Sequence, residues 1–157
     1  MPQSAAMKTL LIVFHSMTGG ARQMADAAAR GAATEPAIAV RRLEARDAGA
    51  ADVLAADGYL FVTPENLAAM AGVMKDFFDR SYYPCLEKTD ALPFACYIRA
   101  GQDGTGTRRA IESITTGLRW KAVQEPLVLR GAWQEGFVAQ VEELGMVVAA
   151  GLEAGVF

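Results

Sequence analysis

The sequence has little of what metal centres and disulfide frameworks require. Its 157 residues include two cysteines and one histidine. Cys85 and Cys96 form no CxxC pair and belong to no Cys/His cluster, so the pattern predicts neither a zinc site nor an iron–sulfur cluster. Two free thiols are typical of a reducing compartment, and we therefore expect a cytoplasmic protein without a metal.

Excess charge and long apolar segments are also scarce. The net charge is −3, and the sequence has no basic stripe, so nucleic acid is not an expected partner. The start, MPQSAAMK, lacks the pattern of a signal peptide, and the apolar runs are far shorter than the ~20 residues that span a bilayer. What the chain does have is 52% hydrophobic residues, which predicts a folded domain. We expect one domain over 1–157, with 1–7 as a disordered extension.

Apolar runs alternate with helical patterns along the chain. The predicted strands are 8–14, 37–43, 58–63, 92–98 and 126–129, and the predicted helices are 20–33, 48–56, 72–83, 107–120 and 137–152. The third strand is expected to stop at Pro64. Strands that alternate with helices indicate a parallel sheet covered on both faces, which is a doubly wound α/β domain.

Ligands of such sheets bind at the carboxyl ends of the strands, where three unusual loops are expected: 15–22, 63–71 and 99–106. The first, HSMTGGAR, places hydroxyl groups and glycines before an alanine-rich helix, and free N–H groups at a helix start bind phosphate. The alternative is a helix cap and tight turn without a ligand. A P-loop is absent, and no GxGxxG follows the first strand. His15 and Thr63 stand where a receiver domain needs acidic residues.

Two segments together resemble a known family. SMTGG after a buried strand resembles the phosphate loop of flavodoxin-like proteins. TPENLAAMAGVMKDFFDR resembles the flavin-contacting segment of NAD(P)H-dependent FMN reductases and flavodoxin-like quinone reductases. The resemblance runs from about residue 8 to 98, and more weakly to the end. It implies a flavodoxin-like doubly wound, five-stranded parallel sheet of order 2-1-3-4-5, with FMN as the cofactor.

The resemblance also implies which residues contact the cofactor. The first loop would bind the phosphate, the second would line the isoalloxazine, and the third would close its other edge. These cofactor-binding residues are Ser16, Met17, Thr18, Gly19, Gly20 and Ala21 in the first loop, Thr63, Pro64, Glu65, Asn66 and Met70 in the second, and Arg99, Ala100, Gly101 and Gln102 in the third. Flavodoxins usually follow Thr-Gly with Asn and Thr. Gly20 and Ala21 stand there instead, so phosphate binding would depend more on backbone N–H groups.

Several residues have more than one interpretation. Asn66 is either a hydrogen-bonding partner of the pyrimidine edge or a turn residue. Glu65 is expected to face solvent, because a carboxylate beside a flavin that reduces to an anion is unfavourable. Arg22 opposes the helix dipole unless an anion lies nearby or solvent surrounds it. His15 is expected to be a packing or turn residue rather than a base.

The function expected from the resemblance is an FMN-dependent oxidoreductase. Such an enzyme takes hydride from NAD(P)H and passes electrons to a small-molecule acceptor such as a quinone or free flavin, and no side chain is required as an acid or base. The absence of aromatic residues from TPENLAAM favours it, because one flavin face would stay open. The alternatives are a flavodoxin-type electron carrier and a flavin-free interaction module. A homo-oligomer is also expected, with Trp120, Trp133 and the terminal Val-Phe as candidates for a dimer surface.

Overall fold

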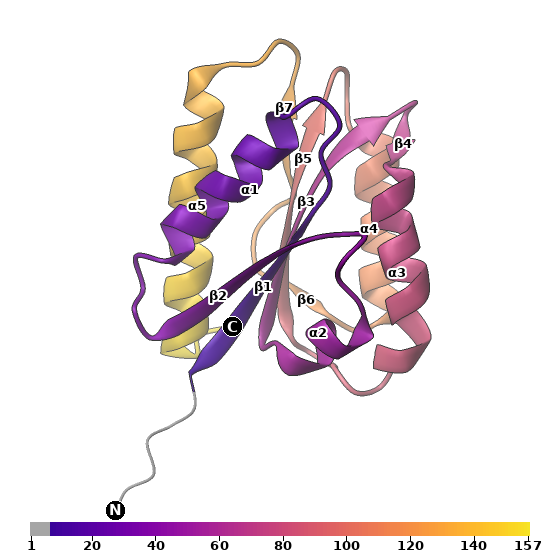
Figure 1. The fold of residues 1–157 in the computed structure, drawn as a ribbon. Helices are drawn as coiled ribbons and strands as arrows, with labels where there is room; N and C mark the ends of the chain where they lie inside the picture. The colour runs from indigo at the N-terminus through magenta and orange to yellow at the C-terminus, as the bar shows by residue number, and fades with distance from the viewer. Residues whose placement is uncertain (1–6) are drawn as a thin grey trace, which may run out of the picture.

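A parallel sheet runs through the middle of the molecule, with helices on both faces (Figure 1). The computed structural model describes residues 7–157, so the predicted extension lies outside the described residues except for Met7. The strands are β1 (Lys8–Phe14), β2 (Ile38–Glu44), β3 (Gly58–Asn66), β4 (Ala69–Met70), β5 (Pro93–Ala100), β6 (Lys121–Ala122) and β7 (Leu127–Arg130). Their order is β2-β1-β3-β5, with β6 and β7 both parallel to β5, so the predicted fold class and strand order are confirmed.

The helices form two layers. They are α1 (Gly20–Ala32), α2 (Ala50–Ala55), α3 (Gly72–Cys85), α4 (Thr105–Gly117) and α5 (Glu135–Ala154). Figure 1 shows α1 and α5 side by side on one face of the sheet, and α3 and α4 on the other. Within residues 7–157, no helix is long and apolar enough to cross a bilayer.

The buried strand β1 shows why the predicted apolar run forms a central strand. Successive side chains of a strand point to opposite faces. Leu10 and Ile12 therefore pack in the core under α1 and α5, while Leu11 and Val13 pack in the core under α2, α3 and α4. A strand that is covered on both faces needs apolar residues at every position, which is what this run supplies.

The third strand does not stop at Pro64, contrary to the prediction. It continues to Asn66 and folds back through β4 as a short antiparallel hairpin. The Val62 carbonyl accepts the His15 N–H, so Val62 directs its polar groups toward β1. Pro64, two residues further, faces the same side. Because the pairing with β1 ends at Val62, the missing N–H of Pro64 interrupts no ladder.

The fifth strand is split rather than continuous. β6 pairs with the start of β5 and β7 with its end, and residues 123–126 separate them. Before β6, Trp120 is 7% exposed and stacks on Tyr59 and Phe61. This buried position contradicts the expectation that Trp120 lies on a dimer surface. Val156 is exposed, and the homo-oligomer stays a prediction.

Candidate functional site

Three loops meet at the carboxyl edge of neighbouring strands. β1 is paired in parallel with β3, and β3 with β5, so the segments after these strands emerge side by side. They are the loop 15–19 before α1, the hairpin that ends β3, and the loop 101–104 before α4. The sheet order therefore brings together the three predicted loops, which are far apart in the sequence.

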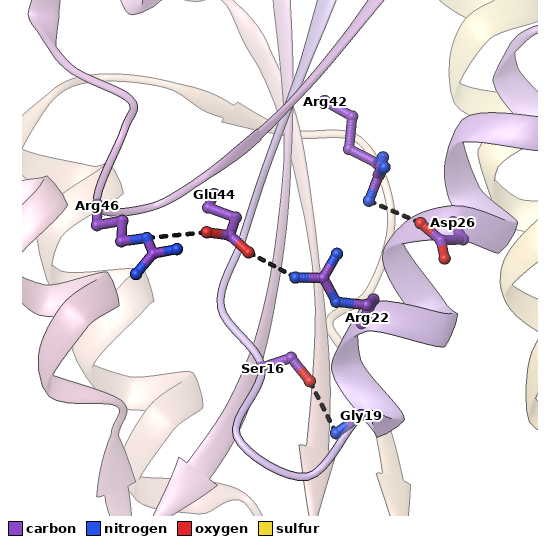
Figure 2. Close-up of polar contacts among 7 residues, drawn as sticks. All are labelled: Ser16, Gly19, Arg22, Asp26, Arg42, Glu44 and Arg46. Atoms are coloured by element: carbon purple, nitrogen blue, oxygen red, sulfur yellow. Dashed lines mark hydrogen bonds and ion pairs between the residues drawn. The ribbon is translucent and has the colours of Figure 1, made fainter.

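The first loop leaves backbone N–H groups free at the start of α1. Gly19 is in a left-handed conformation (φ 100°), and its N–H donates to Ser16 Oγ at 3.0 Å (Figure 2). The first helical hydrogen bond runs from the Gln23 N–H to the Gly19 carbonyl. In residues 7–157, no group accepts from the N–H groups of Gly20, Ala21 and Arg22. A Cβ at Gly19 would meet open space, so a phosphate has room beside these amides. Met17 and Thr18 have exposed side chains.

A network of charged side chains flanks this loop on the β2 side (Figure 2). Arg22 Nη2 lies 2.5 Å from Glu44 Oε1, and Arg46 Nε lies 2.9 Å from Glu44 Oε2. The hydrogen bond from Arg22, together with the charge of Arg46, holds the pKa of Glu44 below its usual value. The cation in the first turn of α1 thus has the Glu44 carboxylate as its counter-ion, while half of its side chain stays exposed.

His15 lies at the start of the first loop. It is half-buried beside a cavity of about 190 Å³ lined by His15, Ser16, Glu44, Arg46 and Val73. Burial lowers the pKa of His15, although the Glu44 carboxylate opposes this shift. The lowered pKa disfavours a positive charge on the imidazole beside the loop. The packing role of His15 stays a prediction.

The hairpin residues lie at different depths. Thr63 and Met70 are buried. The Met70 side chain packs in the core between the sheet and α3, so it does not line the surface of the site, contrary to the expectation. Asn66 Nδ2 donates to Met17 Sδ at 3.1 Å, which links the hairpin to the first loop. A thioether is a weak acceptor, so this amide remains available to a ligand.

Glu65 does not face solvent as a free carboxylate, contrary to the expectation. Its Oε1 accepts the Gly104 N–H at 3.2 Å, and its Oε2 accepts the Thr107 N–H at 3.1 Å. Both donors belong to the start of α4, where free N–H groups and the helix dipole favour an anion. The second loop is therefore attached to α4, the helix that follows the third loop.

In the third loop, Arg99 uses its guanidinium internally. It donates to the carbonyls of Ala100, Leu129 and Gly131 and lies over the rings of Trp133 and Phe137. The Ala100 side chain is buried, while Gly101 and Gln102 are exposed. Of the residues predicted in this loop, Gly101 and Gln102 are the ones that a ligand can reach.

Trp133, which the sequence suggested as a candidate for a dimer surface, is a neighbour of the site. A Cβ at Gly20 would lie 3.4 Å from its ring, so Trp133 forms a wall beside the start of α1. The only available signal was an aromatic residue between the last strand and the last helix. That position indicates nothing until the sheet order puts it next to the first loop.

A larger cavity of about 520 Å³ lies elsewhere, at the sheet edge where β6 and β7 separate. Its lining includes Phe94, Cys96, Thr116 and Trp120 and none of the loop residues considered above. Burial raises the pKa of the Cys96 thiol to about 12, so this thiol is unreactive at neutral pH. Size alone does not make this cavity the functional site, because it lacks the free backbone donors of the loop edge.

Comparison with known proteins gives a family and a set of relatives. Residues 42–134, more than half of the chain, match the family model of NADPH-dependent FMN reductase. A protein named flavodoxin from Aquifex aeolicus (strain VF5) is 30% identical over 112 residues, which cover 71% of this chain and 60% of that relative. The match therefore spans less than two thirds of the relative's length.

Solved structures share the fold. A flavodoxin from the domain Archaea superposes with a TM-score of 0.81 at 15% identity, covering 92% of this chain and 99% of that one. A flavodoxin, WrbA-like protein from Agrobacterium tumefaciens gives a TM-score of 0.76 at 20% identity, with 94% and 98% coverage. At these identities the superpositions establish the architecture alone.

Proposed function

Because this chain belongs to the NADPH-dependent FMN reductase family and has a flavodoxin-like fold, we propose that it binds FMN at the three loops and acts as a flavodoxin-type electron carrier. The observation that carries the proposal is the row of free N–H groups at Gly20, Ala21 and Arg22, at the positive end of α1. Bound FMN would supply the electron chemistry, and the chain would hold and orient it.

The loop residues divide the work of binding. Ser16 keeps the first loop in shape through the Gly19 N–H, and the exposed Thr18 hydroxyl is free to donate to a phosphate oxygen. Asn66 and Gln102 offer amides from the second and third loops. Backbone donors replace the Asn and Thr side chains that flavodoxins usually place after Thr-Gly.

One finding favours a carrier over the oxidoreductase expected from the sequence: the curated relative at 30% identity is named flavodoxin. A second candidate is an NAD(P)H-dependent oxidoreductase with a quinone or free flavin as acceptor. The matched family supports it, as does the lack of aromatic residues in 63–71 and 99–106.

Anaerobic stopped-flow mixing separates the two functions. We expect the FMN-loaded protein to keep its yellow absorbance for minutes after mixing with NADPH or NADH, because a carrier receives its electrons from a partner. Adding a catalytic amount of an NADPH-dependent flavodoxin reductase should then bleach it. Direct bleaching by either nucleotide alone, faster at higher nucleotide concentration, would overturn the carrier and establish the oxidoreductase.

Thr18→Val tests the first loop. If the hydroxyl donates to the phosphate, the FMN dissociation constant should rise by a factor that corresponds to about 1.5–3 kcal/mol, while the stability of the apoprotein stays unchanged. Isothermal titration calorimetry measures the first quantity and thermal unfolding the second. Thr116→Val is the control. It makes the same change at an exposed position near the C-terminal end of α4, away from the three loops. An unchanged FMN affinity would reduce Thr18 to a turn residue.

A further inference from the structure

The hairpin at the end of β3 has an unfavourable backbone. Glu65 pairs with Met70 and Asn66 with Ala69, which leaves Leu67 and Ala68 as a two-residue turn. Both have positive φ values, 51° and 63°, in the left-handed region where glycine and asparagine are the usual residues. Leu67 is fully exposed, so its own packing does not stabilise the turn. Such a conformation persists only where the surrounding structure holds it in place.

Two contacts with α4 hold the hairpin. The Glu65 carboxylate bridges the N–H groups of Gly104 and Thr107, which are the N-cap residue and the third residue of the helix. In the turn, the Ala68 carbonyl lies against Gly106, where a Cβ would come within 1.8 Å of its oxygen. The first contact needs a carboxylate and the second needs a glycine, and both fix the hairpin against the same helical turn.

The third loop runs directly into that turn. Gly104 is buried in a left-handed conformation (φ 74°) and ends the loop that starts at Gly101. The Arg130 Nε donates to the Asp103 carbonyl and ties the loop to β7. The hairpin and the third loop are therefore attached to one rigid helix start, and the Glu65 carboxylate is the charged group that joins them.

From these contacts we propose that Glu65 is a positioning residue that fixes the distance between the two loops flanking the flavin ring. Its oxygens are occupied by α4, so it acts on the cofactor through the hairpin and not by direct contact. The inference rests on the proposed FMN site. The attachment of the hairpin to α4 does not depend on FMN and is measurable without it.

Glu65→Gln keeps the shape of the side chain but removes the charge, and it sets an amide NH₂ against an N–H donor. Hydrogen exchange of the amides in residues 66–70 of the apoprotein should accelerate about tenfold, and the FMN dissociation constant should rise about tenfold, as for a lost hydrogen bond to a charged group. The visible circular dichroism of saturating bound FMN should also change, because the ring is held differently.

A second variant and a control make the test specific. Gly106→Ala pushes the Ala68 carbonyl away from α4 and should give the same three changes. The double variant should change the three readouts no more than the more severe single variant does. Each single change already releases the hairpin from the same helical turn, so the two effects are not additive. Glu112→Gln is the matched control. It makes the same change on the same helix, where the Glu112 carboxylate accepts from Arg108 Nε and not from the hairpin or the loops, so all three readouts should stay at the wild-type level.

Two results would overturn the inference. Unchanged hydrogen exchange in both Glu65→Gln and Gly106→Ala would mean that the hairpin does not depend on this attachment. Weaker FMN binding in Glu65→Gln with unchanged exchange would make Glu65 a direct ligand of the flavin. If the wild-type protein fails to bind FMN, the proposed function fails, and the exchange experiment still decides whether Glu65 positions the hairpin.

Discussion

Gly31→Ala is expected to destabilise the protein by about 3 kcal/mol, at the upper end of the cost of overpacking a core. A Cβ at Gly31 would lie 1.9 Å from the Glu142 carbonyl oxygen of α5, and a Cβ at Gly145 would lie 2.5 Å from the Ala28 carbonyl oxygen of α1. The two helices are therefore in backbone contact, and rigid backbone cannot yield as a flexible side chain does. An added methyl group must push α5 away from α1 and from the sheet.

Thermal and urea unfolding followed by circular dichroism measure this effect. For a domain of this size the expected loss lowers Tm by about 6–12 °C. Gly136→Ala is the control within α5, because a Cβ there meets nothing within 4 Å. Alanine is the better helix former, so the control should gain about 0.5–1 kcal/mol. A stability of Gly31→Ala within about 0.5 kcal/mol of wild type, the spread of ordinary surface substitutions, would contradict the close packing of α1 and α5.

FMN is expected to bind at least about 100-fold more tightly than riboflavin, which lacks the phosphate. Two hydrogen bonds to the phosphate at about 1.5–3 kcal/mol each correspond to a factor of roughly 160 to 25,000. The N–H groups of Gly20, Ala21 and Arg22 and the Thr18 hydroxyl offer enough donors for this difference.

Isothermal titration of the apoprotein with FMN, FAD and riboflavin measures the discrimination. Inorganic phosphate added to the calorimeter cell should weaken FMN binding and leave riboflavin binding unchanged. Free phosphate competes only for the first loop, which riboflavin does not use. Equal affinities for FMN and riboflavin would show that the first loop is a helix cap without a phosphate. FAD should bind more weakly than FMN, because the chain has one phosphate loop and the sequence contains no second phosphate motif.

Much of the fold was predictable because its signals are local. The apolar run of β1 predicts a strand buried on both faces. The spacing of Phe137, Val141, Leu144, Val148 and Leu152 predicts the apolar face of α5, and all but the half-buried Leu144 are buried. The charge pairs Lys75–Asp79 and Asp76–Arg80 were also predictable, since i,i+4 side chains on one helix are neighbours whatever surrounds them.

The errors concern residues whose environment depends on distant segments. Pro64 lies inside a strand because the pairing with β1 ends two residues earlier. Trp120 is buried because Tyr59 and Phe61, on a strand some 60 residues earlier in the sequence, provide the rings on which it stacks. The predicted fifth strand corresponds to β7. The strand β6 was not predicted, because it pairs with β5 through only two residues and two residues form no recognisable pattern.

The candidate site divides in the same way. By itself the sequence determined the fold class, the strand order implied by its family resemblance, and a first loop whose glycines and hydroxyl groups suit a phosphate. Only the tertiary structure decided that Glu65 binds the start of α4, that Arg22 has Glu44 as its counter-ion, and that Trp133 stands beside Gly20. The physical reason is the range of each interaction. Strand and helix patterns arise from neighbours a few residues apart, whereas these contacts exist because parallel pairing brings the ends of separate strands to one edge.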